Sequence, residues 1–275
     1  MIKNKDSLKV KVSNLALSTN IPNKYLIQSF MFEALLKRIS VSKYKDKFII
    51  KGGLLLSFIF GVNLRSTMDL DTTIKGLPLD RTTITKVVNE IISIDLKDNI
   101  KLEIENIKDI REEELYSGFN VNLKAEFDGL RTNLMIDITT GDVITYKEVQ
   151  FEYKTLFDNE IVNIMTYNYE TIIGRNIDNT RMKDYYDLYM FVNLKWNDID
   201  KTILRKAIFN TSEKRETLNY IEEADKYIEL INEDSKLKSL WKNYQNNYAY
   251  AKDISFENTI AAIKVINGVI VPAKV

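Results

Sequence analysis

The 275-residue chain contains neither cysteine nor histidine. The absence of cysteine excludes a disulfide framework, a zinc–thiolate site and a thiol nucleophile. The absence of histidine excludes a Ser-His-Asp triad, imidazole ligands for a metal and an imidazole general base. Any catalysis must therefore depend on carboxylates, hydroxyls, lysine and arginine.

Net charge and long apolar runs are also lacking. The 39 Lys and Arg residues balance 39 Asp and Glu residues, so no overall basic field attracts nucleic acid, and such binding would need a local patch. The N-terminal segment MIKNKDSLKV has no apolar signal-peptide core, and no run approaches the length of a membrane span. We therefore expect a cytoplasmic protein without membrane segments.

Residues 48–77 combine glycines and acids at positions that packing alone does not explain. A short strand-like run ends just before Gly52 and Gly53, and an apolar segment of helical length follows. The next strand-like run places Asp69 and Asp71 on one face, because side chains alternate along a strand. Two adjacent carboxylates repel each other, which favours a divalent metal ion between them. A solvent-exposed acidic pair and an ordinary glycine turn are the alternatives.

Together, the glycines and the acids indicate phosphate chemistry. A glycine turn at a helix N-terminus offers free backbone N–H groups to a phosphate. The carboxylate pair follows one helix later in the sequence. A phosphate cradle beside metal-binding carboxylates is typical of phosphoryl or nucleotidyl transfer.

The rest of the first half alternates between helical and strand periodicity. Helices are expected at residues 7–19, 25–38 and 80–93, and strands at residues 100–108, 119–127 and 132–140. Ser7 is the expected N-cap of the first helix. Asp137 interrupts an apolar strand, where a carboxylate is costly unless it is compensated. It could be a functional acid, cap a turn or pair with Arg131.

From about residue 170 the pattern is helical. The segment TRMKDYYDLYMFVN carries an apolar stripe with charges at its margins. These charges could form helical ion pairs, Arg181 with Asp184 and Lys183 with Asp187, because residues three or four apart are neighbours on a helix.

The run KGGLLL…LRSTMDLDTTIKG resembles motif I of the DNA-polymerase-β-like nucleotidyltransferases, and more narrowly that of the AbiEii/AbiGii toxins of bacterial abortive-infection and toxin–antitoxin systems. The run RMKDYYDLY resembles the last motif of the same family, so the resemblance covers most of the chain. It implies an α+β fold: a nucleotidyltransferase core of mixed sheet and flanking helices at residues 1–165. A helical C-terminal domain at residues 166–275 would then complete the active site.

The resemblance also implies a set of site residues. Metal-binding acids would be Asp69, Asp71 and Asp137; nucleotide-binding residues would be Gly52, Gly53, Arg65 and Thr67; and the last motif would add Lys183 and Asp184 to the catalytic residues. The implied cofactor is Mg²⁺ in a two-metal site, and the implied substrates are a nucleoside triphosphate (NTP) and RNA, in particular tRNA. The implied role is that of a phage-defence toxin with a winged-helix antitoxin partner encoded beside it.

The chain departs from this family in one segment. Relatives carry two Glu-Thr-Ile copies around an Ala-Glu-Lys whose lysine contacts the nucleotide phosphates, whereas residues 167–175 read YNYETIIGR here. One copy and the lysine are missing. Three explanations are open. Lys183 or Arg175 supplies the charge; the protein is a catalytically inactive nucleotidyltransferase fold that binds nucleotide, RNA or a partner without turnover; or the natural chain contains a segment that this sequence omits.

Overall fold

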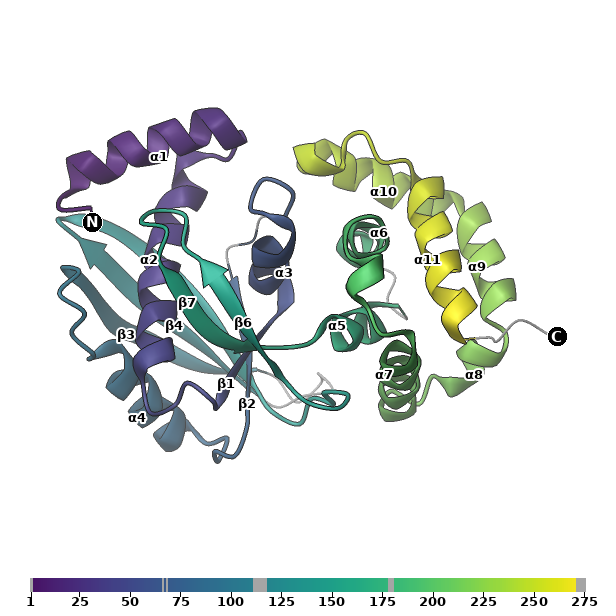
Figure 1. Cartoon of the computed structure of the whole chain (residues 1–275), viewed down its shortest axis with the longest axis horizontal. Coiled ribbons are helices and arrows are strands. Elements are labelled where there is room, and N and C mark those ends of the chain that lie inside the picture. Colours follow the sequence, from purple (N-terminus) through teal and green to yellow (C-terminus); the bar gives the residue numbers. More distant parts are fainter. Residues whose placement is uncertain (1, 66, 68, 111–117, 178–180, 271–275) are drawn as a thin grey trace. The chain divides into compact units, whose positions relative to one another are not determined.

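The structure, a computed structural model, describes residues 2–65, 67, 69–110, 118–177 and 181–270. It divides into two compact units (Figure 1). The first unit comprises residues 1–142 and 148–167, and the second comprises residues 143–147 and 168–275. The chain therefore passes between the units three times.

Within the described residues, a seven-stranded mixed sheet forms the framework of the first unit. Its strands are β1 (Phe48–Lys51), β2 (Asp69–Ile74), β3 (Ile100–Ile110), β4 (Gly118–Phe127), β5 (Leu130–Thr139), β6 (Val149–Lys154) and β7 (Ile161–Thr166). They lie in the order β3-β4-β5-β2-β1-β7-β6. The pairs β2–β5 and β1–β7 are parallel, and the other neighbours are antiparallel. With its flanking helices, this sheet confirms the predicted α+β class.

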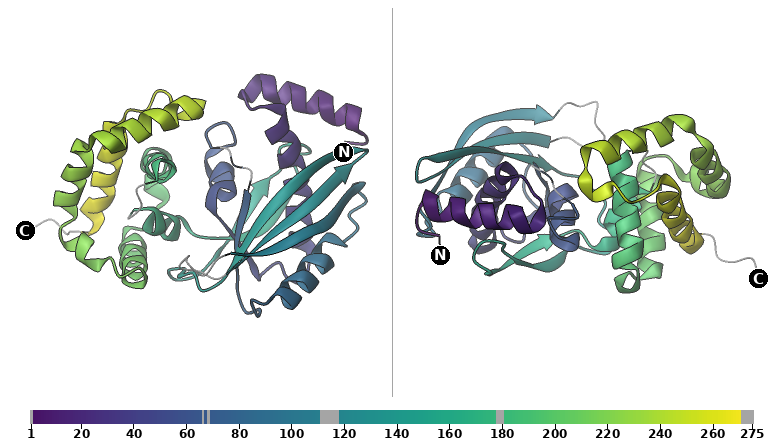
Figure 2. Two further views of the ribbon diagram at one scale, coloured as in Figure 1. Left: turned by 180° about the vertical axis from the view of Figure 1, so that it is seen from behind. Right: turned by 90° about the horizontal axis from the view of Figure 1, so that it is seen from above.

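Helices cover one face of the sheet. The helices of the first unit are α1 (Lys5–Thr19), α2 (Asn23–Val41), α3 (Gly52–Phe60) and α4 (Arg81–Ile92). α2 contacts β5 and β7, and α4 contacts α2 and β3 (Figure 2). Phe30 of α2 meets the ring of Phe127 on β4 edge-on, with 5.2 Å between centroids. On that same face Leu134 and Ile136 of β5 are buried. Asp137 belongs to the opposite face, because side chains alternate along a strand.

Two element boundaries differ from the sequence-based expectation. The N-cap of α1 is Asn4, whose side chain accepts from the Ser7 N–H at 2.9 Å, while Ser7 Oγ accepts from the Asn4 N–H at 3.3 Å. The prediction of Ser7 as the cap was wrong because this serine is the third residue of the helix, the N3 position of a capping box that begins at Asn4. α3 begins at Gly52, before the apolar run, and it ends at Phe60 because Gly61 adopts φ +99°.

The second unit is helical in the residues described, as predicted. Its helices are α5 (Tyr169–Asn176), α6 (Met182–Leu194), α7 (Lys201–Lys214), α8 (Leu218–Glu222), α9 (Ala224–Glu233), α10 (Ser235–Asn247) and α11 (Phe256–Ile270), with short 3-10 turns at Trp196–Asp198 and Ala249–Ala251. Tyr185, Tyr186 and Phe191 of α6 are fully buried in its core. In the described part of the chain, no helix has both the length and the apolar character that crossing a membrane requires.

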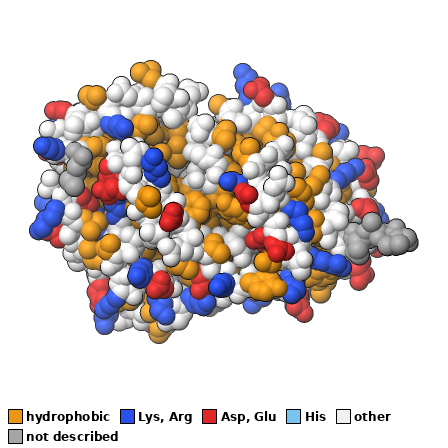
Figure 3. Space-filling view, in the orientation of Figure 1, with side chains coloured by type: hydrophobic (Ala, Val, Ile, Leu, Met, Phe, Trp, Pro, Cys, Tyr) orange, Lys and Arg blue, Asp and Glu red, His pale blue; other side chains and the backbone are white. Residues whose placement is uncertain are grey.

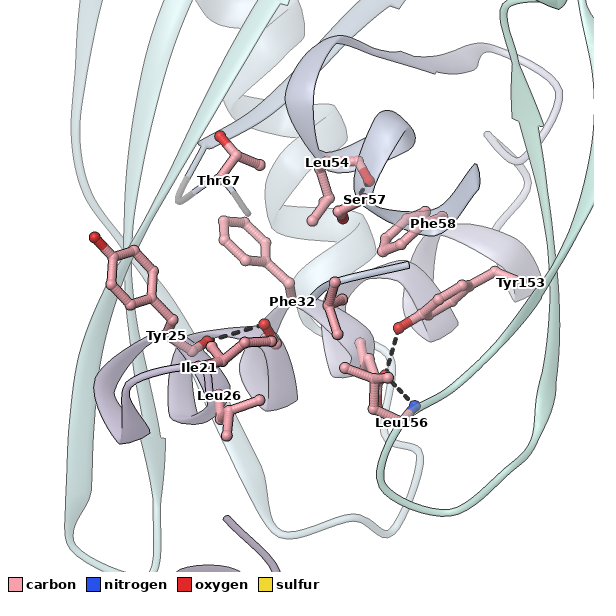
Figure 4. A pocket seen from close by; sticks show the side chains of 13 residues that line it. Ile21, Tyr25, Leu26, Phe32, Leu54, Ser57, Phe58, Thr67, Tyr153 and Leu156 are labelled. Atoms are coloured by element: carbon pink, nitrogen blue, oxygen red, sulfur yellow. Dashed lines mark hydrogen bonds between the residues drawn. The ribbon is translucent and has the colours of Figure 1, made fainter. Parts of the chain in front are cut away.

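A buried carboxyl group connects α2 with the loop between β6 and β7 (Figure 4). Glu33 is 4% exposed, and its Oε1 accepts from the Tyr153 hydroxyl and the Leu156 N–H, both at 2.6 Å. Burial raises the pKa of Glu33 to about 7 and also raises the pKa of Tyr153. The adjoining cavity, with Thr67 on its wall, measures about 20 Å³, which is room for about one water molecule.

Glu33 is expected to make the protein less stable as the pH rises from about 4.5 to 7. The folded state holds the carboxyl proton more tightly than the unfolded state, so this group's contribution to stability is complete below the unfolded-state pKa and is lost as the pH passes the folded-state pKa. The full effect is about 3 kcal/mol. Glu33→Gln keeps the accepting oxygen and should remove most of this dependence, measured as urea midpoints at low and high pH. Glu103→Gln, at an exposed position of β3, is the control and should leave the pH dependence of stability unchanged. Equal pH dependence in both variants would contradict the assignment to Glu33.

Candidate active site

The junction of β1 and α3 brings the glycine pair against two other predicted site residues. Gly52 has φ +67°, and a Cβ added there would lie 1.9 Å from Asp71 Oδ2. A Cβ added at Gly53 would lie 2.9 Å from the Cβ of Thr67. Glycine is therefore required at position 52 for two reasons. The backbone has a left-handed conformation there, and the Asp71 carboxylate lies so close that it leaves no room for a Cβ. The structure thus places Gly52, Gly53, Thr67 and Asp71 together.

Asp69 and Asp71 flank a core residue on β2. Leu70 between them is fully buried, whereas both aspartates are half-buried. The two carboxylates therefore project from the same face of the sheet, as the alternation in the sequence predicted.

Four neighbouring strands each place one polar residue at the same level of the sheet. Lys51 on β1 pairs with Asp71 on β2, and Asp71 pairs with Asp137 on β5. Asp137 in turn pairs with Asn120 on β4, whose Nδ2 donates to Asp137 Oδ1 at 2.6 Å. Paired residues project from the same face. Lys51, Asp71, Asp137 and Asn120 therefore form a transverse row, called the polar row below, on the face opposite to the one that α2 covers.

The two non-catalytic alternatives for Asp137, an ion pair with Arg131 and a turn cap, are wrong. Arg131 does not pair with it, because the Arg131 Nε donates to Glu126 Oε2 at 2.7 Å. Asp137 also lies inside β5 and so does not cap a turn. It is half-buried, and its compensation comes from the Asn120 amide, which sequence reasoning missed.

Lys51 connects the ends of β1 and β5. Its Nζ donates to Thr139 Oγ1 at 2.6 Å and to the carboxylate of Asp142, which also accepts from the Tyr167 hydroxyl. The Asp142 side chain is fully buried, and that of Lys51 is 13% exposed. Sequence reasoning also missed Lys51; the available signal was a lysine directly before the glycine pair, at the end of a strand.

The remaining predicted residues are Arg65, Lys183 and Asp184. Arg65, in the turn after α3, is buried. Lys183 and Asp184 belong to the second unit, on α6, where Lys183 is exposed and Asp184 is buried. Asp184 accepts from Arg181 Nε at 2.6 Å, so the helical ion pair expected for these two residues is observed.

The carboxylates of Asp69, Asp71 and Asp137 fit Mg²⁺ in donor chemistry, because this ion prefers carboxylate and other oxygen ligands. Among the residues that the structure describes, no three acidic side chains gather closely enough to enclose an ion. Mg²⁺ is commonly held by one or two carboxylates together with substrate phosphates. Asp71 and Asp137, adjacent in register beside the glycine turn, suit an ion held in that way.

Gly52→Ala is expected to destabilise the protein and to disturb the site. The left-handed φ alone costs alanine about 1–2 kcal/mol, and the new Cβ must displace the Asp71 carboxylate. Gly129→Ala is a matched control, since Gly129 has φ +77° with nothing within 4 Å of an added Cβ. Denaturant unfolding should show a larger loss for Gly52→Ala. Equal losses would mean that the contact with Asp71 is unimportant.

A family model described as "Nucleotidyl transferase AbiEii toxin, Type IV TA system" matches residues 34–262. The match extends over most of the chain and covers the glycine turn, the polar row and α6. It defines the protein as one of the nucleotidyltransferase class found in toxin–antitoxin systems. The chain belongs to the AbiEii toxin family. A family of this kind implies an antitoxin partner.

Solved structures resemble the fold. The JHP933 protein of Helicobacter pylori is 15% identical, with 91% of this chain and 93% of that chain covered and a TM-score of 0.50. A second H. pylori protein, described as a candidate nucleotidyltransferase, is 13% identical, with 91% and 96% covered and a TM-score of 0.46. At such identities the first likeness supports the fold alone. No curated protein matches the chain.

Proposed function

We propose that the protein is a Mg²⁺-dependent nucleotidyltransferase that transfers a nucleotide from an NTP to RNA, with tRNA as the acceptor. The observation that carries the proposal is the polar row beside the glycine turn, because it joins paired carboxylates to a place where phosphates can approach the backbone. In the cell, this activity would serve as the toxin of a phage-defence system.

The residues of the first unit would divide the work. The N–H groups at the start of α3, with Gly52, Gly53 and Thr67, would bind the triphosphate. Asp69, Asp71 and Asp137 would hold Mg²⁺ together with the substrate phosphates, and the ion would supply charge neutralisation to the phosphates and activation of the attacking hydroxyl. Asn120 would keep the Asp137 carboxylate oriented through its 2.6 Å hydrogen bond. The RNA hydroxyl would displace pyrophosphate, so one P–O bond forms as another breaks.

Lys183 and Asp184 of α6 are the remaining proposed catalytic residues. Lys183 is exposed and can offer a cation to the phosphates, and Asp184 with its Arg181 partner would fix the start of the helix. Lys183 or Arg175 would take the place of the family lysine missing from residues 167–175.

RNA binding would depend on local charge. Basic and acidic side chains are interspersed over the face shown in Figure 3, in keeping with the zero net charge. Affinity for RNA is therefore expected to be modest and to come from the site itself. The antitoxin is proposed to be a winged-helix repressor encoded beside the toxin.

The proposal is tested by incubating the purified protein with Mg²⁺, each of four α-labelled NTPs in turn, and tRNA or total RNA. Label should enter RNA from at least one NTP, and EDTA should abolish its entry. No label from any NTP, with or without Mg²⁺, would refute a transferase acting on these RNAs.

The shortness of α5 favours a second candidate, a fold that binds without turnover. α5 spans only Tyr169–Asn176, and its last-turn cation is Arg175. In that case NTP should still raise the melting temperature of the protein, while no label enters RNA.

A further inference from the structure

The polar row continues from Asp137 into a chain of asparagine amides on the same face of the sheet. Asn120 Nδ2 donates to Asp137 Oδ1 at 2.6 Å, and Asn120 Oδ1 accepts from Asn122 Nδ2 at 2.7 Å. The same Asn122 nitrogen donates to Asn106 Oδ1 at 2.9 Å. The three half-buried residues Asn106, Asn122 and Asn120, called the amide relay below, therefore link β3 and β4 to an acid of the candidate active site.

The acid determines the direction of every hydrogen bond in the amide relay. A carboxylate offers only acceptor atoms, so Asn120 must present its NH2 group to Asp137. The Asn120 carbonyl oxygen can then only accept, so Asn122 must also present its NH2 group. That group has two hydrogens, one for Asn120 and one for Asn106. Exchanging oxygen and nitrogen in any one amide would set two like groups against each other.

A β-bulge lies at the outer end of the amide relay. The register of β3 with β4 shifts by one residue between Ile104 and Asn106, which makes Glu105 an extra residue. Bulges re-aim side chains and are frequent beside active sites. The Glu105 carboxylate pairs with Lys124 Nζ at 2.9 Å. The neutral amide of Asn106, rather than that carboxylate, therefore accepts from Asn122.

The amide relay is more than a clasp between two strands. β3 and β4 already pair along their whole length, from Ile100 to Ile110 and from Gly118 to Phe127. The relay ends on Asp137, an acid inside a strand, where a carboxylate is costly unless it is compensated. In metal sites, the groups that hydrogen-bond to a ligating carboxylate fix its orientation and strengthen metal binding.

We infer that Asn122 and Asn106 are positioning residues for Mg²⁺ binding, because they hold the Asn120 amide in the one orientation that keeps the Asp137 carboxylate in place. The inference rests on the proposed function, in which Asp137 is a metal ligand. Without the Asn122 amide, the Asn120 side chain is free to turn, and its NH2 group is no longer directed at the acid. Both positioning residues act through Asn120.

The test measures the binding of Mn²⁺ alone to the metal-free, full-length protein, from the EPR signal of the free ion. Mn²⁺ prefers the same oxygen ligands as Mg²⁺, and its binding requires neither NTP nor RNA. Asn122→Leu removes both donors and should raise the Kd for Mn²⁺ about 10-fold, as losing the partner of a metal-binding side chain does. Asn133→Leu is the control, at an exposed asparagine on the Asp137 face of β5, and should leave the Kd unchanged.

Two isosteric variants test the direction of the amide relay. Asn106→Asp keeps an acceptor for Asn122 and should bind Mn²⁺ at least as tightly as the wild type, because the added negative charge attracts the ion. Asn122→Asp has no hydrogen to give to Asn120 and should weaken binding, although the added charge alone would strengthen it. The same change of side chain thus has opposite effects at the two positions. Asn122→Asp also provides the test if Asn122→Leu does not fold.

A double variant assigns the effect to Asn120. Asn120→Ala should weaken Mn²⁺ binding about 10- to 100-fold. Adding Asn122→Leu should weaken it no further, because the amide relay acts only through Asn120. Urea unfolding of each variant measures what the same hydrogen bonds contribute to stability. A purely structural role would change the urea midpoint and leave the Kd for Mn²⁺ unchanged.

Three results would overturn the inference while the proposed function stands. They are equal Mn²⁺ affinities of the wild type and Asn122→Leu, a loss of affinity in Asn106→Asp, and an undiminished effect of Asn122→Leu in the Asn120→Ala background. If the wild type binds no Mn²⁺, the inference fails together with the proposed metal site, and the entry of label into RNA decides separately whether the protein is a transferase.

Discussion

Asp71→Asn is expected to reduce nucleotide transfer about 10³-fold and to abolish growth inhibition in cells that express the protein. Asp71 lies at the centre of the site, in register with Lys51 and Asp137 and against Gly52. A carboxylate that holds a catalytic metal accounts for several kcal/mol of transition-state stabilisation, and each 1.36 kcal/mol corresponds to tenfold in rate. The measurement is the initial rate of label transfer from NTP to RNA.

The control for Asp71→Asn is Asp109→Asn, on the same sheet but exposed and paired with Arg81 on the surface. This variant should transfer label at the wild-type rate. A second readout does not depend on turnover: Mg²⁺ with NTP should raise the melting temperature of the wild type but not of Asp71→Asn. If Asp71→Asn keeps both the rate and the thermal shift, Asp71 is not part of the site.

Lys51→Met is expected to lower the free energy of unfolding by about 3–5 kcal/mol. The substitution removes the ammonium group that pairs with a fully buried Asp142 carboxylate, and removing one partner of a buried ion pair is strongly destabilising. The Tyr167 hydroxyl remains as a donor to Asp142 but brings no positive charge. Urea unfolding at neutral pH measures the loss.

Two further variants show whether the loss comes from the buried charge. Adding Asp142→Asn to Lys51→Met should restore most of the stability, because the buried carboxylate that has lost its lysine is then replaced by a neutral amide. Lys75→Met breaks an exposed pair with Glu148, in which the lysine side chain is 59% exposed, and should lose no more than about 1 kcal/mol. Equal losses for Lys51→Met and Lys75→Met would mean that Lys51 is no more than a surface charge.

Local periodicity was sufficient to locate most elements of the first unit. Alternation in residues 119–127 and 132–140 predicted β4 and β5, and it placed Asp69 and Asp71 on one face of β2. The glycine pair before an apolar run correctly indicated a strand followed by a helix. In each case a pattern of a few residues determines which side chains are buried.

The polar row could not be predicted in the same way. Its registers join strands that are far apart in the sequence, as when Asp71 lies beside Asp137. Register depends on the pairing of whole strands, and the local sequence specifies only which face each side chain occupies. Asn120 and Lys51 therefore remained unnoticed, since an asparagine or a lysine in an alternating strand is an ordinary surface residue until its neighbours are known.

Because the chain crosses between the units after residues 142, 147 and 167, no single cut separates them. Residues 143–147 belong to the second unit, where the Thr145 N–H donates to Thr171 Oγ1. A protease that cuts in this segment would leave β7 on the C-terminal fragment, still paired with β1 of the N-terminal fragment. The two fragments should travel together on a sizing column and part only in denaturant. In limited proteolysis and in the design of gene fusions, the two units therefore have to be treated as a single piece, although each has its own core.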